Sequence, residues 1–191
     1  MHSRKRLLIS SLGVVLGEAT PLEPTILTSD VTRFYQVYDA NGGHPTAEQI
    51  QRDYIDVGST GLHDLARDRA VTGASIAAAI ARNPAAYERA RSCMAVLPRV
   101  AVRLRLILAR LGRLYPEARF PPITIVVSRT KPVGMTNAGG VRISIEALCA
   151  TEYMNPNIEE RFVHVVAHEH AHIEQDSPIT DKPSPRFSRR L

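Results

Sequence analysis

The sequence predicts an α+β domain that is mostly helical and carries a small β-sheet. Apolar residues recur at helical spacing through residues 29–114. Two β-branched segments follow at 120–128 and 139–148, and a last helix with acidic residues in its first turn begins near Asn157. With 191 residues and 44% hydrophobic content, the chain is long enough for one domain with its own core.

The first 19 residues are typical of a secretory signal peptide. A basic start, MHSRKR, precedes the apolar stretch LLISSLGVVLG, and Gly17 and Ala19 are small residues before an expected cut after Ala19. The alternative is an ordinary buried helix or strand. We expect an exported protein, periplasmic or extracellular, with a signal peptide at 1–19, a domain at 20–175 and an irregular tail at 176–191. The apolar stretch is too short to span a bilayer, and membrane association is not indicated beyond the signal peptide.

The positive charge of the chain lies mostly at its ends. The formal net charge is +5, but residues 20–175 hold 17 basic and 16 acidic groups. The high isoelectric point therefore does not predict a nucleic-acid partner.

The region before the strands is expected to be helical throughout. The segment SDVTRFYQVYDA at 29–40 has a helical apolar period, a helix resumes near Thr46, and residues 72–114 predict three helices separated at Asn83-Pro84 and Leu97-Pro98. In the last of the three, four arginines fall near one face. We expect this face to be solvated; its members are Arg99, Arg103, Arg110 and Arg113.

The two strand segments differ in pattern. FPPITIVVS at 120–128 is β-branched and bounded by prolines, whereas GGVRISIEAL at 139–148 places Val141, Ile143 and Ile145 on one side and Arg142, Ser144 and Glu146 on the other. Glycines 134, 139 and 140 predict a hairpin-like turn that connects these two strands.

Two cysteines, Cys93 and Cys149, are present. In an exported chain they can pair, or they can be two small buried hydrophobic residues. A single pair offers no spacing pattern to test, and we slightly favour the unpaired interpretation.

The last helix carries the motif HExxH, formed by His168, Glu169 and His172. The two histidines are one turn apart, so both imidazoles can reach one zinc ion, and Glu169 can take a proton from the water that the metal activates. The chemistry that this predicts is peptide-bond hydrolysis without a covalent intermediate. The alternative is a pair of core histidines satisfied by hydrogen bonds.

The surroundings of the motif allow further predictions. The strand just upstream is expected at the edge of the sheet, where it can hold an extended peptide by backbone pairing, which makes Gly140, Val141 and Arg142 candidate substrate-binding residues. His164 shares the face of the pair but is too far along the helix axis to bind the same ion, and His170 points away and is expected to pack.

A catalytic zinc ion needs three protein ligands and a water molecule, and the sequence supplies two histidines. Glu174, Gln175 and Asp176 follow His172 too closely or lie along the same axis. Asp181 is the one later acidic residue that a turn could bring round. The third ligand is therefore not identified.

Several segments in the same order resemble a bacterial family of predicted zinc-dependent proteases that is distantly similar to gliding-motility lipoproteins. They are SDVTRFYQVYDA, DYIDVGSTGL, LYPEARFPPITIVV, AGGVRISIEAL and VVAHEHAHIEQ, and the resemblance covers about residues 25–175. It implies a zincin-like domain with His168 and His172 as zinc ligands, Glu169 as catalytic acid and base, and Glu146 as a structural or site-lining carboxylate. The family looks as though it continues into a helix with a glutamate ligand, from which this sequence departs, so we expect a truncated C-terminal part.

Two functions follow as hypotheses. The first is an exported zinc metallopeptidase of the HExxH type that acts on a peptide or protein substrate. The second is a catalytically inactive or truncated remnant that binds metal weakly and has a binding role.

Overall fold

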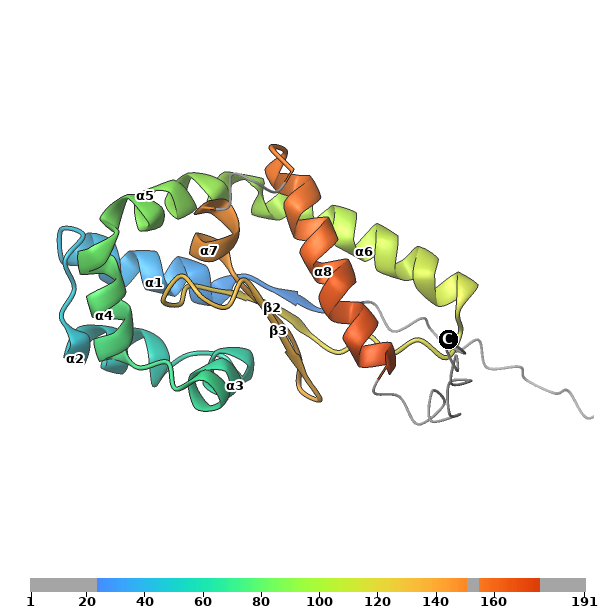
Figure 1. The fold of residues 1–191 in the computed structure, drawn as a ribbon, viewed down its shortest axis with the longest axis horizontal. Coiled ribbons are helices and arrows are strands. Elements are labelled where there is room, and N and C mark those ends of the chain that lie inside the picture. The colour runs from blue at the N-terminus through green and yellow to red at the C-terminus, as the bar shows by residue number, and fades with distance from the viewer. Residues whose placement is uncertain (1–23, 151–154, 176–191) are drawn as a thin grey trace, which may run out of the picture.

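Helices form most of the structure and surround one small sheet (Figure 1). The computed structural model describes residues 24–150 and 155–175. The expected signal peptide at 1–19 and the expected tail at 176–191 lie outside these residues. The predicted fold class, α+β and mostly helical with a small sheet, is confirmed.

The elements follow one another in this order: β1 Ile26–Leu27, α1 Ser29–Ala40, α2 Ala47–Ile50, a π-helical turn Gln51–Ile55, α3 Thr60–Arg69, α4 Gly73–Arg82, α5 Pro84–Cys93, a 3₁₀ turn Met94–Val96, α6 Leu97–Leu114, β2 Ile123–Val126, β3 Gly134–Asn137, β4 Gly140–Ser144, α7 Ile145–Ala150 and α8 Ile158–Gln175. Three α-helices, α4 to α6, cover residues 72–114 as predicted. In the described residues, no helix is both long and apolar enough to cross a membrane.

Polar side chains begin several of these helices. Thr46 accepts a hydrogen bond from the Gln49 backbone and forms a capping box with that residue, and Thr72 does the same with Ser75. Ser59 caps α3 by accepting from the Leu62 N–H. Each cap satisfies a backbone donor that the first turn of a helix leaves unpaired.

The sheet has the strand order β1-β2-β4-β3. Strand β4 is parallel to β2 and antiparallel to β3, so the predicted hairpin between 120–128 and 139–148 is wrong. The partner of β4 in the hairpin is Gly134–Asn137, a segment too short and too poor in β-branched residues to be recognised as a strand. Gly140 opens β4 at a φ of +129°, and a Cβ there would lie 2.2 Å from the Pro122 carbonyl oxygen. The tight start of β4 therefore requires glycine.

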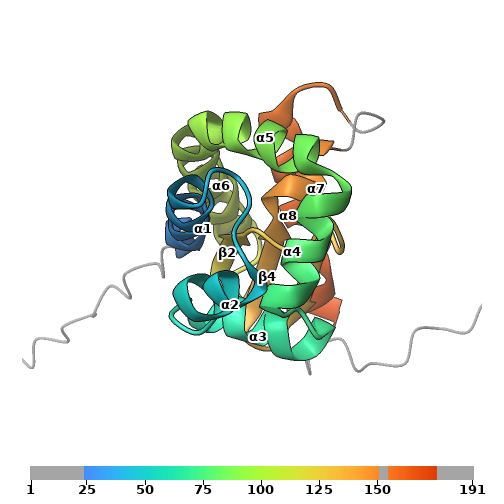
Figure 2. The same cartoon turned by 90° about the vertical axis from the view of Figure 1, so that its left-hand side faces the viewer.

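Helices α3 and α8 cover opposite faces of the sheet at the β3–β4 hairpin. Alternate residues of a strand point to opposite faces. The hydroxyl of Thr136 in β3 bonds to Glu169 in α8, whereas the neighbouring Asn137 donates to Asp68 in α3. Figures 1 and 2 show the sheet lying between these two helices.

The α3 face contains a buried ion pair. Arg142 in β4 is 1% exposed, and its Nη2 donates to Asp64 Oδ2 at 2.6 Å. Its Nη1 donates to the Gly140 carbonyl oxygen. Strand β4 is therefore buried on both sides: α3 covers the side of Arg142, and the side of Val141 and Ile143 is buried as well.

Cys93 and Cys149 form a disulfide bond, so the unpaired interpretation is wrong. The bond joins the last residue of α5 to α7, two helices that pack against each other. The sequence pattern did not reveal this contact, because the two cysteines are 56 positions apart and meet only through the packing of α5 against α7.

Helix α6 packs along α8 (Figure 1). The predicted solvated arginine face is confirmed, since Arg99, Arg110 and Arg113 are exposed and Arg103 is partly exposed. At this surface Arg99 pairs with Glu159 at 2.6 Å, and Arg103 pairs with Glu160, at the start of α8.

Candidate functional site

Helix α8 lies across the edge of the sheet with one face buried. Asn157 begins it by accepting hydrogen bonds from the backbone N–H groups of Glu159 and Glu160. Its buried apolar residues face β3, β4 and α6; they are Phe162, Val165, Val166 and Ile173. This packing fixes the rotation of the helix and therefore the direction of its polar residues.

His168 and His172 lie side by side on the exposed flank of α8. Their Nε2 atoms are 3.3 Å apart, and their rings meet edge to face with centroids 4.9 Å apart. His172 Nδ1 lies 3.0 Å from the Gln175 amide oxygen. When His172 donates to that oxygen, Nδ1 carries the proton and Nε2 presents its lone pair.

This spacing fits two ligands of one zinc ion. Zinc binds histidine nitrogen at about 2.0–2.1 Å with tetrahedral angles, which places two such nitrogens about 3.3 Å apart. A hydrogen bond from Nδ1 to the Gln175 oxygen fixes the orientation of the imidazole, as such bonds do for histidines that bind a metal. Within residues 24–150 and 155–175, no third His, Cys, Asp or Glu joins the pair. Asp176 and Asp181 lie outside these ranges.

Glu169 turns away from the two imidazoles toward the edge strand β3. Its Oε2 accepts a hydrogen bond of 2.7 Å from the Thr136 hydroxyl, and its side chain is half-buried. Gly134 lies against the same carboxylate, because a Cβ at that position would be 2.5 Å from Glu169 Oε1. A glycine and a threonine two residues apart on β3 thus hold the carboxylate against this strand.

The other two histidines of α8 lie apart from the pair. His170 is 4% exposed and stacks on Phe120 with ring centroids 5.3 Å apart, so its predicted packing role is confirmed. Burial lowers the pKa of this imidazole, opposed by nearby Glu174. His164 is exposed one turn before His168.

Gly140, Val141 and Arg142, the predicted substrate-binding residues, do not lie on an edge strand. Their strand, β4, pairs with β2 on one side and with β3 on the other, so its backbone groups are already used and all three residues are buried. The prediction of an edge strand there is therefore wrong. Among the described strands, β3 is the one at the edge of the sheet beside α8.

The outer side of β3 has backbone groups available for pairing. Ser144 N–H donates to the Val133 carbonyl oxygen at 2.9 Å. Since antiparallel strands alternate between bonded and non-bonded pairs, the N–H and C=O groups of Gly134 and Thr136 face away from β4.

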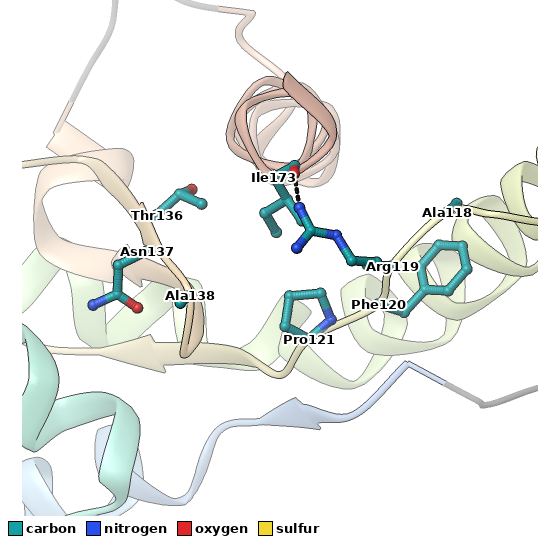
Figure 3. A pocket seen from close by; sticks show the side chains of 8 residues that line it. All are labelled: Ala118, Arg119, Phe120, Pro121, Thr136, Asn137, Ala138 and Ile173. Atoms are coloured by element: carbon teal, nitrogen blue, oxygen red, sulfur yellow. Dashed lines mark hydrogen bonds between the residues drawn. The ribbon is translucent and has the colours of Figure 1, made fainter. Parts of the chain in front are cut away.

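A cavity of about 540 Å³ opens beside β3 (Figure 3). Its walls come from β3, from residues 118–121 and from Ile173 in α8. Thr136 both lines the cavity and bonds to Glu169. The guanidinium of Arg119 enters it and donates to the Ile173 carbonyl oxygen.

A second cavity, about 420 Å³, lies on the other side of α8, against α6. Its lining is largely apolar and includes His170, Leu104 and Val166. Neither cavity is lined by His168, Glu169 or His172. The cavity beside β3 is linked to the motif through Thr136, which lines it and bonds to Glu169.

Glu146 is a buried structural residue. It is 0% exposed at the start of α7, and Oε1 accepts the Thr130 N–H at 2.9 Å. Burial raises the pKa of this carboxyl to about 7, although hydrogen bonds from the backbone oppose the rise. Tyr87 and Tyr54 donate to the carbonyl oxygens of Ser128 and Val127 in the same loop. These bonds hold the loop that leads into β3.

Three residues around the motif were missed from the sequence: Gly134, Thr136 and Arg119. Gly134 had been assigned to a turn, and neither Thr136 nor Arg119 belongs to a motif. The one available signal was the position of Gly134 and Thr136 two residues apart, which places them on one face if the segment is a strand.

The chain was compared with models of known protein families, with curated proteins and with solved structures. None of the three comparisons found a match.

Proposed function

We propose that the chain is a zinc-dependent peptide hydrolase in which His168 and His172 hold the metal and Glu169 moves the proton. The observation that carries the proposal is the 3.3 Å separation of the two Nε2 atoms on an exposed flank of α8. A zinc ion bound there supplies Lewis-acid polarisation of a carbonyl group and lowers the pKa of water.

The protein residues divide the remaining work. Glu169 accepts a proton from the attacking water and delivers it to the leaving amine. The Thr136 hydroxyl orients that carboxylate by bonding to Oε2, which leaves Oε1 on the side of Gly134. The outward backbone groups of Gly134 and Thr136 pair with an extended peptide and hold the bond to be cleaved near Glu169.

A second candidate function is metal binding without turnover. It is favoured by the presence of two donors, rather than three, in the described residues. The same 3.3 Å contact is also an ordinary hydrogen bond between the two imidazoles when His168 carries its proton on Nε2.

Zinc content and hydrolysis, measured on the same samples, test the proposal. The full chain should bind one zinc ion and cleave a quenched fluorescent peptide library. Glu169→Gln should retain zinc and lose roughly 10²- to 10⁴-fold in turnover, since it removes the proton carrier only. His172→Gln should lose zinc and turnover together.

His164→Gln is the matched control, because His164 lies on the same helix and is exposed. It should keep both zinc and activity. A chain that binds no zinc at micromolar metal contradicts the proposal. Zinc that is bound loosely, without hydrolysis of any peptide, favours the second candidate.

A further inference from the structure

The cavity beside β3 contains a guanidinium group with unused donors. Figure 3 shows Arg119 reaching in between Ile173 and Pro121. One of its five N–H groups donates to the Ile173 carbonyl oxygen at the last turn of α8. The contact with Glu174 involves the Arg119 backbone N–H, at 2.9 Å. In the part of the chain that the structure describes, no carboxylate forms an ion pair with this guanidinium.

The other polar groups in the wall are already engaged. The Thr136 hydroxyl donates to Glu169. Asn137 donates to Asp68 at 2.7 Å and accepts the Gly139 N–H at 2.7 Å, and Figure 3 shows its amide pointing away from Arg119. The rest of the wall includes Ala118, Pro121 and Ala138. Arg119 is exposed, so an anion from solvent can reach its unused donors.

Arg119 lies within reach of a peptide bound at Glu169. Its partner, Ile173, is four residues beyond Glu169 on α8, a rise of about 6 Å along the axis. An extended peptide advances about 3.3 Å per residue, so this distance corresponds to one or two residues. Thr136 contacts Glu169 and also lines the cavity that Arg119 enters.

We infer that Arg119 determines substrate specificity by binding a carboxylate that lies one or two residues from the bond to be cleaved. The inference rests on the proposed function. A planar guanidinium matches a carboxylate with two parallel hydrogen bonds. The carboxylate belongs either to an acidic side chain or to the end of the peptide.

Equilibrium binding to the full chain carrying Glu169→Gln tests the inference without turnover. Fluorescent peptides of one apolar sequence carry a Glu or a Gln at each position in turn, with a free or an amidated C-terminus. A peptide with the carboxylate in place should bind roughly tenfold more tightly than its neutral counterpart. A preference that follows the Glu side chain identifies an acidic residue; one that follows the free C-terminus identifies the terminal carboxylate.

Variants at Arg119 supply the decisive comparison. Adding Arg119→Gln should abolish the preference, and Arg119→Glu should reverse it toward a peptide with Lys at the same position. A misfolded variant cannot produce a reversed preference. Arg105→Gln, which changes an exposed arginine of α6, should leave the original preference intact.

Equal affinity for the Glu and Gln peptides, or binding of neither, would overturn the inference. So would a preference located more than two residues from the cut that the wild-type chain makes. If the preference holds but the wild-type chain hydrolyses nothing, the proposed function fails and carboxylate binding by Arg119 stands.

Discussion

The two faces of the β3–β4 hairpin use polar residues in opposite ways. On the α3 face, Arg142 and Asp64 are paired and Arg142 is buried. On the α8 face, Glu169 is half-buried, and the imidazoles of His168 and His172 are exposed. Charges that are buried and paired hold the fold, whereas polar groups at a solvent-accessible edge can meet a metal ion or a substrate.

The largest effect is expected on the α3 face. Asp64→Ala leaves the Arg142 guanidinium buried without its carboxylate, and should lower the free energy of unfolding by about 3–5 kcal/mol. Urea denaturation measures this loss.

Arg67→Ala is the control for that variant. It removes the other, exposed partner of Asp64, bonded at 2.8 Å, and should cost less than about 1 kcal/mol. Similar losses of unfolding free energy for the two variants would mean that the buried Arg142–Asp64 pair stabilises the fold no more than the exposed Arg67–Asp64 pair. Zinc binding by the folded Asp64→Ala chain should be unchanged.

Next in size is the pH dependence due to Glu146. Its pKa in the folded chain, about 7, is above the usual 4.5 because the carboxyl is buried. Below 4.5 the carboxyl is neutral in both states. As pH rises from 4.5 to 7, the unfolded chain ionises first, so stability falls by about 3 kcal/mol.

Glu146→Gln should remove this fall. The difference in unfolding free energy between variant and wild type, measured at several pH values, isolates the contribution of this one carboxyl. A difference that stays constant between pH 4.5 and 7 would show that Glu146 ionises in the folded chain as it does in water.

The smallest effect is expected from one methyl group on the α8 face. Gly134→Ala places a Cβ within 2.5 Å of the present position of Glu169 Oε1, so the carboxylate must move. Peptide hydrolysis should fall about tenfold, which corresponds to about 1.4 kcal/mol, while zinc content stays the same.

Met135→Leu is the matched change on the same strand. Met135 faces α3, where its sulfur accepts from Arg69. Hydrolysis by this variant should equal that of the wild type. Equal losses for both variants would indicate a general weakening of β3 instead of a displaced carboxylate.

The sequence was sufficient for the long helices and for the motif. Helical spacing located α1, α4 to α6 and α8, because each buries one apolar stripe. The position of His170 away from His168 followed from the same period. These features depend on neighbours within about one turn, so a local pattern contains them.

Sheet pairing and the site around Glu169 could not be obtained in this way. The parallel pairing of β2 and β4 depends on contacts between residues distant in sequence. Strand β3 contains glycine and asparagine and is marked by no local preference. Arg119 reaches Ile173 across 54 positions of the chain. Such contacts are set by the assembled fold and leave no periodic trace in the sequence.

The disulfide bond between Cys93 and Cys149 has a consequence for how the molecule opens. It closes a covalent ring that contains α6 and the strands β2, β3 and β4, whereas α8 follows Cys149 and lies outside the ring. Helix α8 is therefore free to detach while the ring stays closed, and its amide protons should exchange with solvent faster than those of β4. Zinc bound at His168 and His172 would slow that exchange by bridging two turns of the helix, and would slow it further if a third ligand came from outside α8.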